Sequence, residues 1–135
     1  MKKNIVFGIM IGFLILAISS CGLNKTTMAD RVGYFEDDLN GSRTNIIDNI
    51  HSDAASYNTL DYDYWHDNTN IWDPSKTPFI ISNLVEGSSS ITADFAYSGS
   101  TGNTIYFELK DDGDFFSGEN WKLLSCSINS GSNQF

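Results

Sequence analysis

The segment "SITADFAYSGSTGNTIYFELKD", residues 90–111, decides the fold of this chain. Apolar and polar side chains alternate through residues 90–98 and again through 103–111. A period of two is the pattern of a β-strand with one buried face, and the intervening "GSTG" is typical of a turn. Because so short a connection joins antiparallel neighbours, the segment predicts a β-hairpin.

Two further strands extend the hairpin. "PFIISNLVE" (78–86) precedes the hairpin and is joined to it by "GSS". "NWKLLSCSI" (120–128) follows the hairpin and is joined to it by "DGDFFSGE". Both connections are rich in the turn residues Gly, Ser and Asp. The sequence therefore predicts a four-stranded antiparallel meander, and "ASYNTL" (55–60) could add a fifth strand.

The alternation also suggests a register. Phe95 opposite Phe107, and Phe107 opposite Leu123, would keep the large apolar side chains on one face. The same register places Glu108 opposite both Asp94 and Lys122. Facing carboxylates could form a catalytic pair with one raised pKa. A solvated row of charges is the preferred interpretation, because the row lies on the face away from the helices.

Upstream of the strands, apolar residues recur at three- and four-residue steps, as in amphipathic helices. "LNGSRT" interrupts this pattern, since Gly41 is unfavourable inside a helix and Ser42 is a good N-cap. Two helices are expected, over 29–40 and 42–52, with Asp30 as the cap of the first. The predicted fold class is α+β, with an N-terminal helix pair packed on a curved antiparallel sheet of four to five strands.

The first twenty residues have the pattern of a bacterial secretion signal. Lys2 and Lys3 precede the apolar run "IVFGIMIGFLILAI", which is shorter than the roughly 20 residues of a spanning helix. "AISSC" resembles a bacterial lipobox that ends at Cys21. The alternatives are an uncleaved anchor and an ordinary signal peptide with a chance cysteine.

The lipobox resemblance implies that residues 1–20 are removed and that the Cys21 thiol carries a diacylglycerol, with a further acyl chain such as palmitate. Several acyl chains would hold the protein stably on a membrane. We therefore expect a lipidated tether (21–28), a single domain (29–135) and an extracytoplasmic location in the cell envelope.

The charge of the chain is strongly acidic. Eight Lys and Arg stand against 17 Asp and Glu, and loss of the two N-terminal lysines would take the net charge from −9 to about −11. Such a surface disfavours nucleic acid as a partner. The sequence has no P-loop, dinucleotide-binding glycine motif, G-x-S-x-G or paired CxxC, so no cofactor is predicted.

The helical segment "YFEDDLNGSRTNIIDNIHSDAASY" (34–57), a loop-rich middle and a meander closing on "ENWKLLSCSI" together resemble the NTF2-like (cystatin-like α+β) superfamily over residues 29–129. The resemblance implies helices packed in the concavity of a curved sheet, with a conical pocket between them. The superfamily includes isomerases, dehydratases, transport factors and secreted domains, so it implies little about activity.

Two groups of residues could carry acid/base or metal chemistry. His51 and Asp53 could form an acid/base dyad, although His at a helix C-terminus and Asp in a turn are also ordinary structural choices. In "KDDGDFF" (110–116) three aspartates surround Gly113, but the spacing is not that of an EF-hand, and Asp-Gly is an ordinary hairpin turn.

The segment "DYDYWHDNTNIWDP" (61–74) holds the densest cluster of aromatic and acidic side chains. Tyr62, Trp65 and Trp72 are the predicted ligand-binding residues, because small-molecule sites mix aromatic walls with a few polar groups. The alternative is a lid that packs both tryptophans over the core. A metal site at His66 and the nearby aspartates has little support, since no second histidine lies at a helical spacing.

The preferred interpretation is a lipid-anchored binding or interaction module for a small apolar ligand or an envelope protein, with no catalytic residue assigned. One alternative is an NTF2-like pocket enzyme of the isomerase or hydratase type that uses His51, His66 and a nearby Asp. Another is a purely structural envelope protein. Cys126 would be unpaired if Cys21 is lipidated, and it is interpreted as a small buried hydrophobe rather than a reactive thiol.

Overall fold

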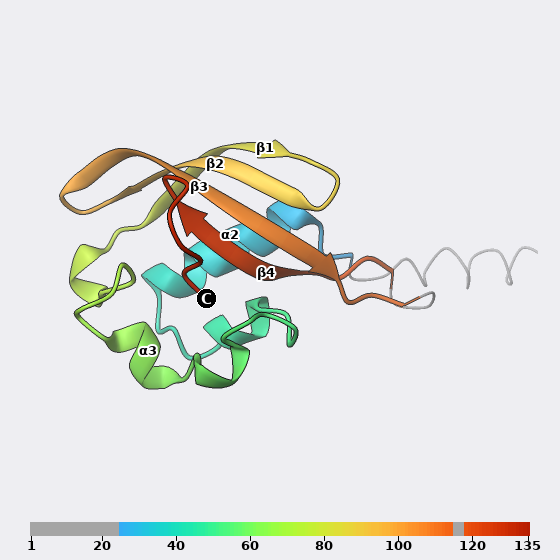
Figure 1. Cartoon of the computed structure of the whole chain (residues 1–135), viewed down its shortest axis with the longest axis horizontal. Helices are drawn as coiled ribbons and strands as arrows, with labels where there is room; N and C mark the ends of the chain where they lie inside the picture. Colours follow the sequence, from blue (N-terminus) through green and yellow to red (C-terminus); the bar gives the residue numbers. More distant parts are fainter. Residues whose placement is uncertain (1–24, 115–117) are drawn as a thin grey trace, which may run out of the picture.

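Four antiparallel strands form a meander in the order β1-β2-β3-β4, and one long helix packs against one face of it (Figure 1). The computed structural model describes residues 25–114 and 118–135. The expected signal segment (1–20), Cys21 and half of the expected tether therefore lie outside the described residues. The elements are α2 (Met28–Asn40), η1 (Ile46–Asn49), η2 (Tyr57–Thr59), α3 (Tyr62–His66), η3 (Pro74–Lys76), β1 (Ile80–Glu86), β2 (Ser90–Tyr97), β3 (Ser100–Asp111) and β4 (Trp121–Ile128).

The α+β class and the four-stranded antiparallel sheet are confirmed. The fifth strand is wrong, because residues 57–59 form the short 3-10 helix η2 with local hydrogen bonds. The outer edge of β4 is contacted instead by isolated bridges from Ile50 to Leu123 and from Asn133 to Ser127. None of the helices in the described part of the chain is long and apolar enough to cross a membrane.

The predicted faces of the strands are correct, but the predicted register is wrong. Phe95 lies opposite Asn103, four residues from the expected partner, and Phe107 lies opposite Ile91 and Cys126. The β2–β3 turn is tighter than expected because Gly99, with φ of 87°, makes the turn that "GSTG" was expected to make. The four-residue shift between β2 and β3 is even and keeps each side chain on its face. The shift between β3 and β4 is three residues, and a bulge between Glu108 and Leu109 leaves both Leu123 and Cys126 buried.

The predicted charge row does not form. Asp94 lies opposite Thr104, and Glu108 lies opposite Ser125, whose hydroxyl donates a hydrogen bond of 3.0 Å to the Glu108 carboxylate. Both acids are exposed. Lys122 lies opposite another lysine of β3 rather than opposite Glu108. The carboxylates of the sheet are therefore separate surface groups and not a catalytic pair.

The first helix is confirmed, but its cap is Thr27 and not Asp30. The Thr27 hydroxyl accepts a hydrogen bond from the Asp30 N–H, and the Asp30 carboxylate accepts one from the Thr27 N–H, each 3.1 Å long. This capping box satisfies two N–H groups that the first turn of a helix leaves free. The hydrogen bond from Thr27 also lowers the pKa of Asp30.

The second predicted helix, over 42–52, is wrong. Only η1 forms there, and the chain is extended at Ile50, where the His51 N–H donates to the Leu123 carbonyl at 2.8 Å. Arg43 has a left-handed backbone, with φ of 63°, which no α-helix accommodates. Pairing with β4 and a buried arginine thus overrode the helical pattern in this segment.

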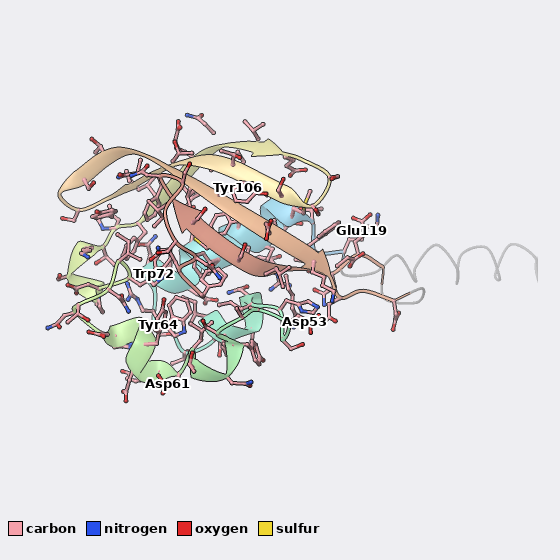
Figure 2. The ribbon with its side chains drawn as sticks, in the orientation of Figure 1. Asp53, Asp61, Tyr64, Trp72, Tyr106 and Glu119 are labelled. Carbon is pink, nitrogen blue, oxygen red and sulfur yellow. The ribbon has the colours of Figure 1, made fainter. Side chains whose placement is uncertain are left out.

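The core centres on Phe35 of α2. Its ring makes edge-on contacts with Trp65, Trp72, Phe107 and Phe135, with centroids 5.5–6.1 Å apart. Each fully buried large side chain contributes about 1.5–3 kcal/mol to folding. Figure 2 shows Trp72 between the sheet and the helical layer that contains α3. Trp65 and Trp72 of residues 61–74, here called the aromatic segment, are consequently part of the hydrophobic core.

Candidate functional site

The three predicted ligand-binding residues have different environments. The Trp72 and Trp65 side chains are 0% and 1% exposed, whereas Tyr62 is 62% exposed. The Tyr62 ring stacks on the His66 ring at a centroid distance of 3.8 Å. Of the three, only Tyr62 presents most of its surface to solvent, and the two tryptophans fit the lid interpretation.

Three aspartates of this segment stabilise turns or cap a helix, namely Asp61, Asp67 and Asp73. An Asp61 carboxylate oxygen accepts from the Tyr64 N–H at 3.0 Å and caps α3. Asp67 and Asp73 accept from the N–H groups of Thr69 and Ser75, and these bonds lower the pKa of both carboxyls. In the described ranges, no group of three or more His, Cys, Asp or Glu residues is placed to hold a metal ion.

A buried arginine, which the sequence analysis did not single out, joins the aromatic segment to α2. The Arg43 guanidinium donates to the carbonyl oxygens of Leu39 at 2.8 Å, Trp65 at 2.6 Å and Trp72. Its Cζ lies 5.5 Å from the centre of the Phe79 ring, a cation–π contact. Burial lowers the pKa of this guanidinium, and the negative charge of Asp73 opposes that effect. No sequence pattern marks an arginine whose backbone is left-handed, so this role was not predictable.

A cavity of about 150 Å³ lies beside α3. Most of its walls are apolar, and Tyr62 supplies an aromatic ring on the side of α3. Asp61 and Thr44 add carboxylate and hydroxyl groups. A cavity of this size accommodates a ligand of about one aromatic ring. The lining residues are Arg43, Thr44, Ile46, Ile47, Leu60, Asp61, Tyr62 and Trp65.

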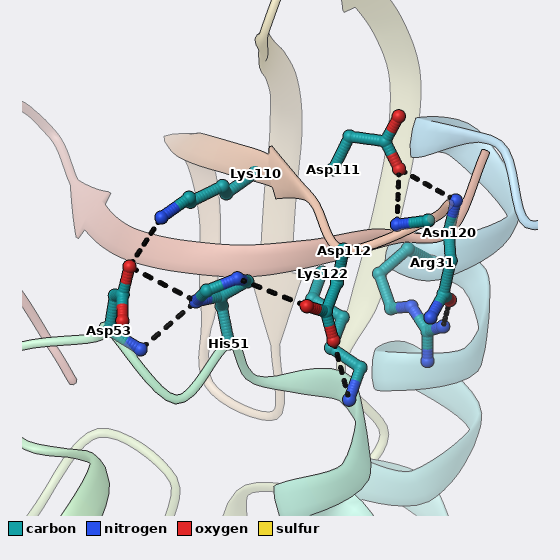
Figure 3. Close-up of polar contacts among 9 residues, drawn as sticks. Arg31, His51, Asp53, Lys110, Asp111, Asp112, Asn120 and Lys122 are labelled. Carbon is teal, nitrogen blue, oxygen red and sulfur yellow. Dashed lines mark hydrogen bonds and ion pairs between the residues drawn. The ribbon is translucent and has the colours of Figure 1, made fainter. Parts of the chain in front are cut away.

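His51 occupies a second polar region, between two acidic side chains (Figure 3). Its ring is buried, with the residue 5% exposed. Nδ1 lies 3.9 Å from the Asp53 carboxylate, and Nε2 lies 3.7 Å from the Asp112 carboxylate. Lys110 pairs with Asp53, and Lys122 lies 3.8 Å from Asp112. The predicted neighbours His51 and Asp53 are thus brought together within a network of charges.

The contacts of His51 engage both of its ring nitrogens. Nδ1 accepts the backbone N–H of Asp53 at 2.9 Å, so the neutral ring carries its proton on Nε2. Nε2 then points this proton toward Asp112, and no nitrogen lone pair is available to a substrate. The hydrogen bond from Lys110 lowers the pKa of Asp53, which keeps that carboxyl ionised.

Asp111, the last residue of β3, closes the hairpin to β4. The Asp111 carboxylate accepts from the N–H groups of Gly113 at 2.9 Å and Asn120 at 2.8 Å. This arrangement fits the turn interpretation of the segment. Cys126 is fully buried in β4, and burial raises the pKa of its thiol well above the usual value. It behaves as a small core side chain, since a buried thiol is a poor nucleophile.

The stability of the domain should fall in acid. Hydrogen bonds lower the pKa of Asp30, Asp67 and Asp73 in the folded state, so their contribution is present at neutral pH. It is lost as pH falls through the folded-state values, below about 3.9. Circular dichroism melts should show a midpoint that declines below about pH 4.

The matched control for this prediction is Asp73→Asn, which should flatten the acid decline. Equal acid declines in Asp73→Asn and in the unsubstituted protein would contradict the prediction.

No family model matches this sequence, and no curated protein or solved structure matches it significantly.

Proposed function

We propose that the chain is a bacterial lipoprotein of the cell envelope, held on a membrane through lipid on Cys21, whose acidic domain is a binding module and not an enzyme. The lipobox resemblance of "AISSC" supports the anchor. The core includes Met28 and Phe135, so packing of the domain begins within a few residues of the expected tether.

The observation that carries the binding proposal is the cavity beside α3. It combines apolar walls from Ile46, Ile47 and Leu60 with the exposed ring of Tyr62. Small-molecule sites have this mixture of apolar surface and a few polar groups. We propose that the cavity binds a small, mainly apolar ligand or an apolar side chain of an envelope protein. Of the three predicted ligand-binding residues, Tyr62 is the one that would contact it.

The alternative, an isomerase or hydratase, has weaker support. Its predicted residues His51 and His66 do not line the cavity. Nδ1 of His51 accepts a backbone N–H, and Nδ1 of His66 lies 2.8 Å from the Tyr62 carbonyl. Acid/base catalysis needs an imidazole within reach of a bound substrate. A structural role in the envelope is the third candidate. The absence of any ligand binding to the cavity in binding assays would favour it.

We also propose an NTF2-like relationship, at the level of fold. One helix on one face of an antiparallel meander supports it, as does the order of helix before strands. The 3-10 segment in place of a second helix departs from that pattern. Superposition of an experimentally determined structure on NTF2-like domains would test the relationship, and a different strand connectivity would end it.

Replacing Cys21 by alanine should abolish lipid attachment. A bacterial host grown with a radiolabelled fatty acid should label the unsubstituted protein and not Cys21→Ala, because the thiol is the only acceptor in the lipobox. Cys126→Ala is the matched control and should keep the label, since Cys126 is buried in β4. Label on Cys21→Ala, or none on the unsubstituted protein, would refute the anchor.

Filling the cavity should prevent binding of a small aromatic probe. Titration of the isotope-labelled domain with phenol should shift amide resonances of residues 43–47 and 60–65 in NMR spectra, because the probe matches the cavity in size. Ile47→Trp should remove these shifts.

Val85→Trp is the matched control for the filling variant, because Val85 is 68% exposed on the sheet and should leave the titration unchanged. Equal shifts in Ile47→Trp and the unsubstituted domain would show that the probe binds elsewhere. The absence of shifts in both would remove the small-ligand proposal and favour a structural role.

A further inference from the structure

The chain enters the domain at a fixed point. The Thr26 N–H donates to the Glu119 carbonyl at 3.0 Å, and the Thr26 carbonyl accepts from the Trp121 N–H at 3.2 Å. Thr26 forms a parallel bridge with Asn120. The first described residues are therefore paired with the stem where β3 leads into β4, here defined as Asp111, Asp112 and residues 119–121 and called the β3–β4 stem.

The residues on either side of Thr26 reinforce this attachment. Lys25 Nζ lies 3.9 Å from the Glu119 carboxylate, and Thr27 begins the capping box of α2. Met28 is 8% exposed and belongs to the core. From Thr26 onward the chain is part of the fold. The N-terminal segment is therefore attached to the domain at the β3–β4 stem.

The distance from the anchor to this point is short. Five peptide steps separate Cys21 from Thr26, and at about 3.6 Å each they span at most about 18 Å. A domain of a hundred residues has a radius of gyration of about 13 Å and is about 35 Å across. The β3–β4 stem must therefore lie near the lipid surface, and the far end of an upright domain is beyond its reach.

The topology separates the two ends of the sheet. In an antiparallel meander the β1–β2 and β3–β4 connections share one end, and the β2–β3 turn lies at the other. The Ser98 N–H in that turn donates to the Lys76 carbonyl of η3 at 2.8 Å, so η3 also lies there. Figure 2 shows Glu119 at the stem end and Asp61, which caps α3, at the opposite end.

Charge does not separate an upright domain from one that lies flat. The β3–β4 stem carries Asp111, Asp112 and Glu119, and the outer face of the sheet carries Asp94 and Glu108. Lys25 and Lys122 lie 3.9 Å from Glu119 and 3.8 Å from Asp112. The reach of the segment between Cys21 and Thr26 is therefore the observation that brings the stem to the lipid surface.

We infer that the β3–β4 stem is the membrane-facing surface of the domain, and that α3, η3 and the cavity face away from the bilayer toward a ligand or partner. This inference rests on the lipid anchor of the proposed function. The partner of the stem is a lipid surface, identified by the five-residue reach from Cys21 and the pairing of Thr26 with Asn120.

Depth-dependent quenching tests this orientation. Single cysteines at Glu119, Tyr106 and Ser98, each in a Cys126→Ala background, would carry a fluorescent label at the stem, on the outer face of the sheet and at the distal turn. The lipidated proteins would be reconstituted in phosphatidylglycerol and phosphatidylcholine vesicles that contain a nitroxide-headgroup lipid. Quenching should be several-fold stronger at Glu119 than at Ser98, with Tyr106 close to Ser98.

Other patterns would overturn the inference. Equal quenching at Glu119 and Tyr106 would mean that the domain lies on its outer sheet face, and equal quenching at all three positions would mean that it has no fixed orientation. Thr26→Pro removes the N–H that donates to Glu119 and should reduce the ratio of quenching at Glu119 to that at Ser98. Lys25→Ala is its control and should change the ratio little, because surface ion pairs are weak.

A second anchoring method separates this inference from the lipidation proposal. A hexahistidine segment in place of residues 1–21 would attach the labelled domain to vesicles with a nickel-chelating lipid. The same quenching order in this protein would support the orientation even if fatty-acid labelling of Cys21 failed. Loss of the order here, with Cys21 labelling intact, would refute the orientation alone.

Discussion

Replacing Trp72 by alanine should lower the free energy of unfolding by about 3–5 kcal/mol. Its side chain is fully buried, with ring centroids 5.5 Å from Phe35, 6.0 Å from Phe79 and 6.1 Å from Phe95. Truncation removes these contacts and leaves a cavity that the sheet and α2 cannot close. Small domains have only about 5–15 kcal/mol of stability, so the variant should be close to unfolding at 37 °C.

Urea denaturation followed by tryptophan fluorescence and circular dichroism would measure this effect. Tyr62→Ala is the matched control in the same segment, because Tyr62 is 62% exposed, and its stability should change by less than about 0.5 kcal/mol. Similar losses in the two variants would contradict the assignment of Trp72 to the core and of Tyr62 to the surface.

Replacing Arg43 by methionine should lower the free energy of unfolding by about 3 kcal/mol, although the substitution makes the site more apolar. The guanidinium donates to the carbonyls of Leu39, Trp65 and Trp72, and methionine would leave all three without this donor. An unpaired buried carbonyl costs about 1–3 kcal/mol, and removal of a desolvated charge offsets part of the total. The cation–π contact with Phe79 is lost as well.

The same urea titration measures this effect. Lys76→Met is a suitable control, because Lys76 donates to a single carbonyl, that of Asn70, at 2.8 Å and is only half-buried. Its loss should be below about 1 kcal/mol. A neutral or stabilising Arg43→Met would show that the buried charge costs more than its hydrogen bonds contribute. The contact between α2 and the aromatic segment would then be stabilised by apolar packing alone.

The sequence predicted the strands well because their signal is local. Alternation in β2 and β3 identifies the face that each side chain occupies, and a shift of four residues left that result intact. It could not predict the register, because the turn at Gly99 and the bulge between Glu108 and Leu109 depend on how the strands twist against each other.

The helical prediction failed where long-range contacts compete with periodicity. Residues 46–50 have the spacing of an amphipathic helix, but Ile50 pairs with Leu123 of β4 instead. Arg31 shows the same kind of contact, since its guanidinium donates to the Trp121 carbonyl at 2.6 Å and to Asn49 and Asn120. Contacts between residues some 18 to 90 positions apart leave no local pattern in a sequence.

The candidate site was only partly predictable. Aromatic content identified the segment around α3, but it could not separate Tyr62, which is exposed beside the cavity, from Trp65 and Trp72, which are buried. Composition states which side chains can bind an apolar ligand, and burial decides which of them are accessible. The cavity itself also needs Leu60 and η1, which are brought to α3 by the folding of the chain.

By itself the sequence determined the α+β class, the four strands, the faces that they bury and the acidic charge, because periodicity and composition act over a few residues. The tertiary structure alone decided the strand register, the 3-10 segment in place of a second helix, the burial of two tryptophans and the pairing of Thr26 with the β3–β4 stem. These features depend on backbone hydrogen bonds and packing between segments far apart in the chain, where the free energy of the whole fold outweighs local preference.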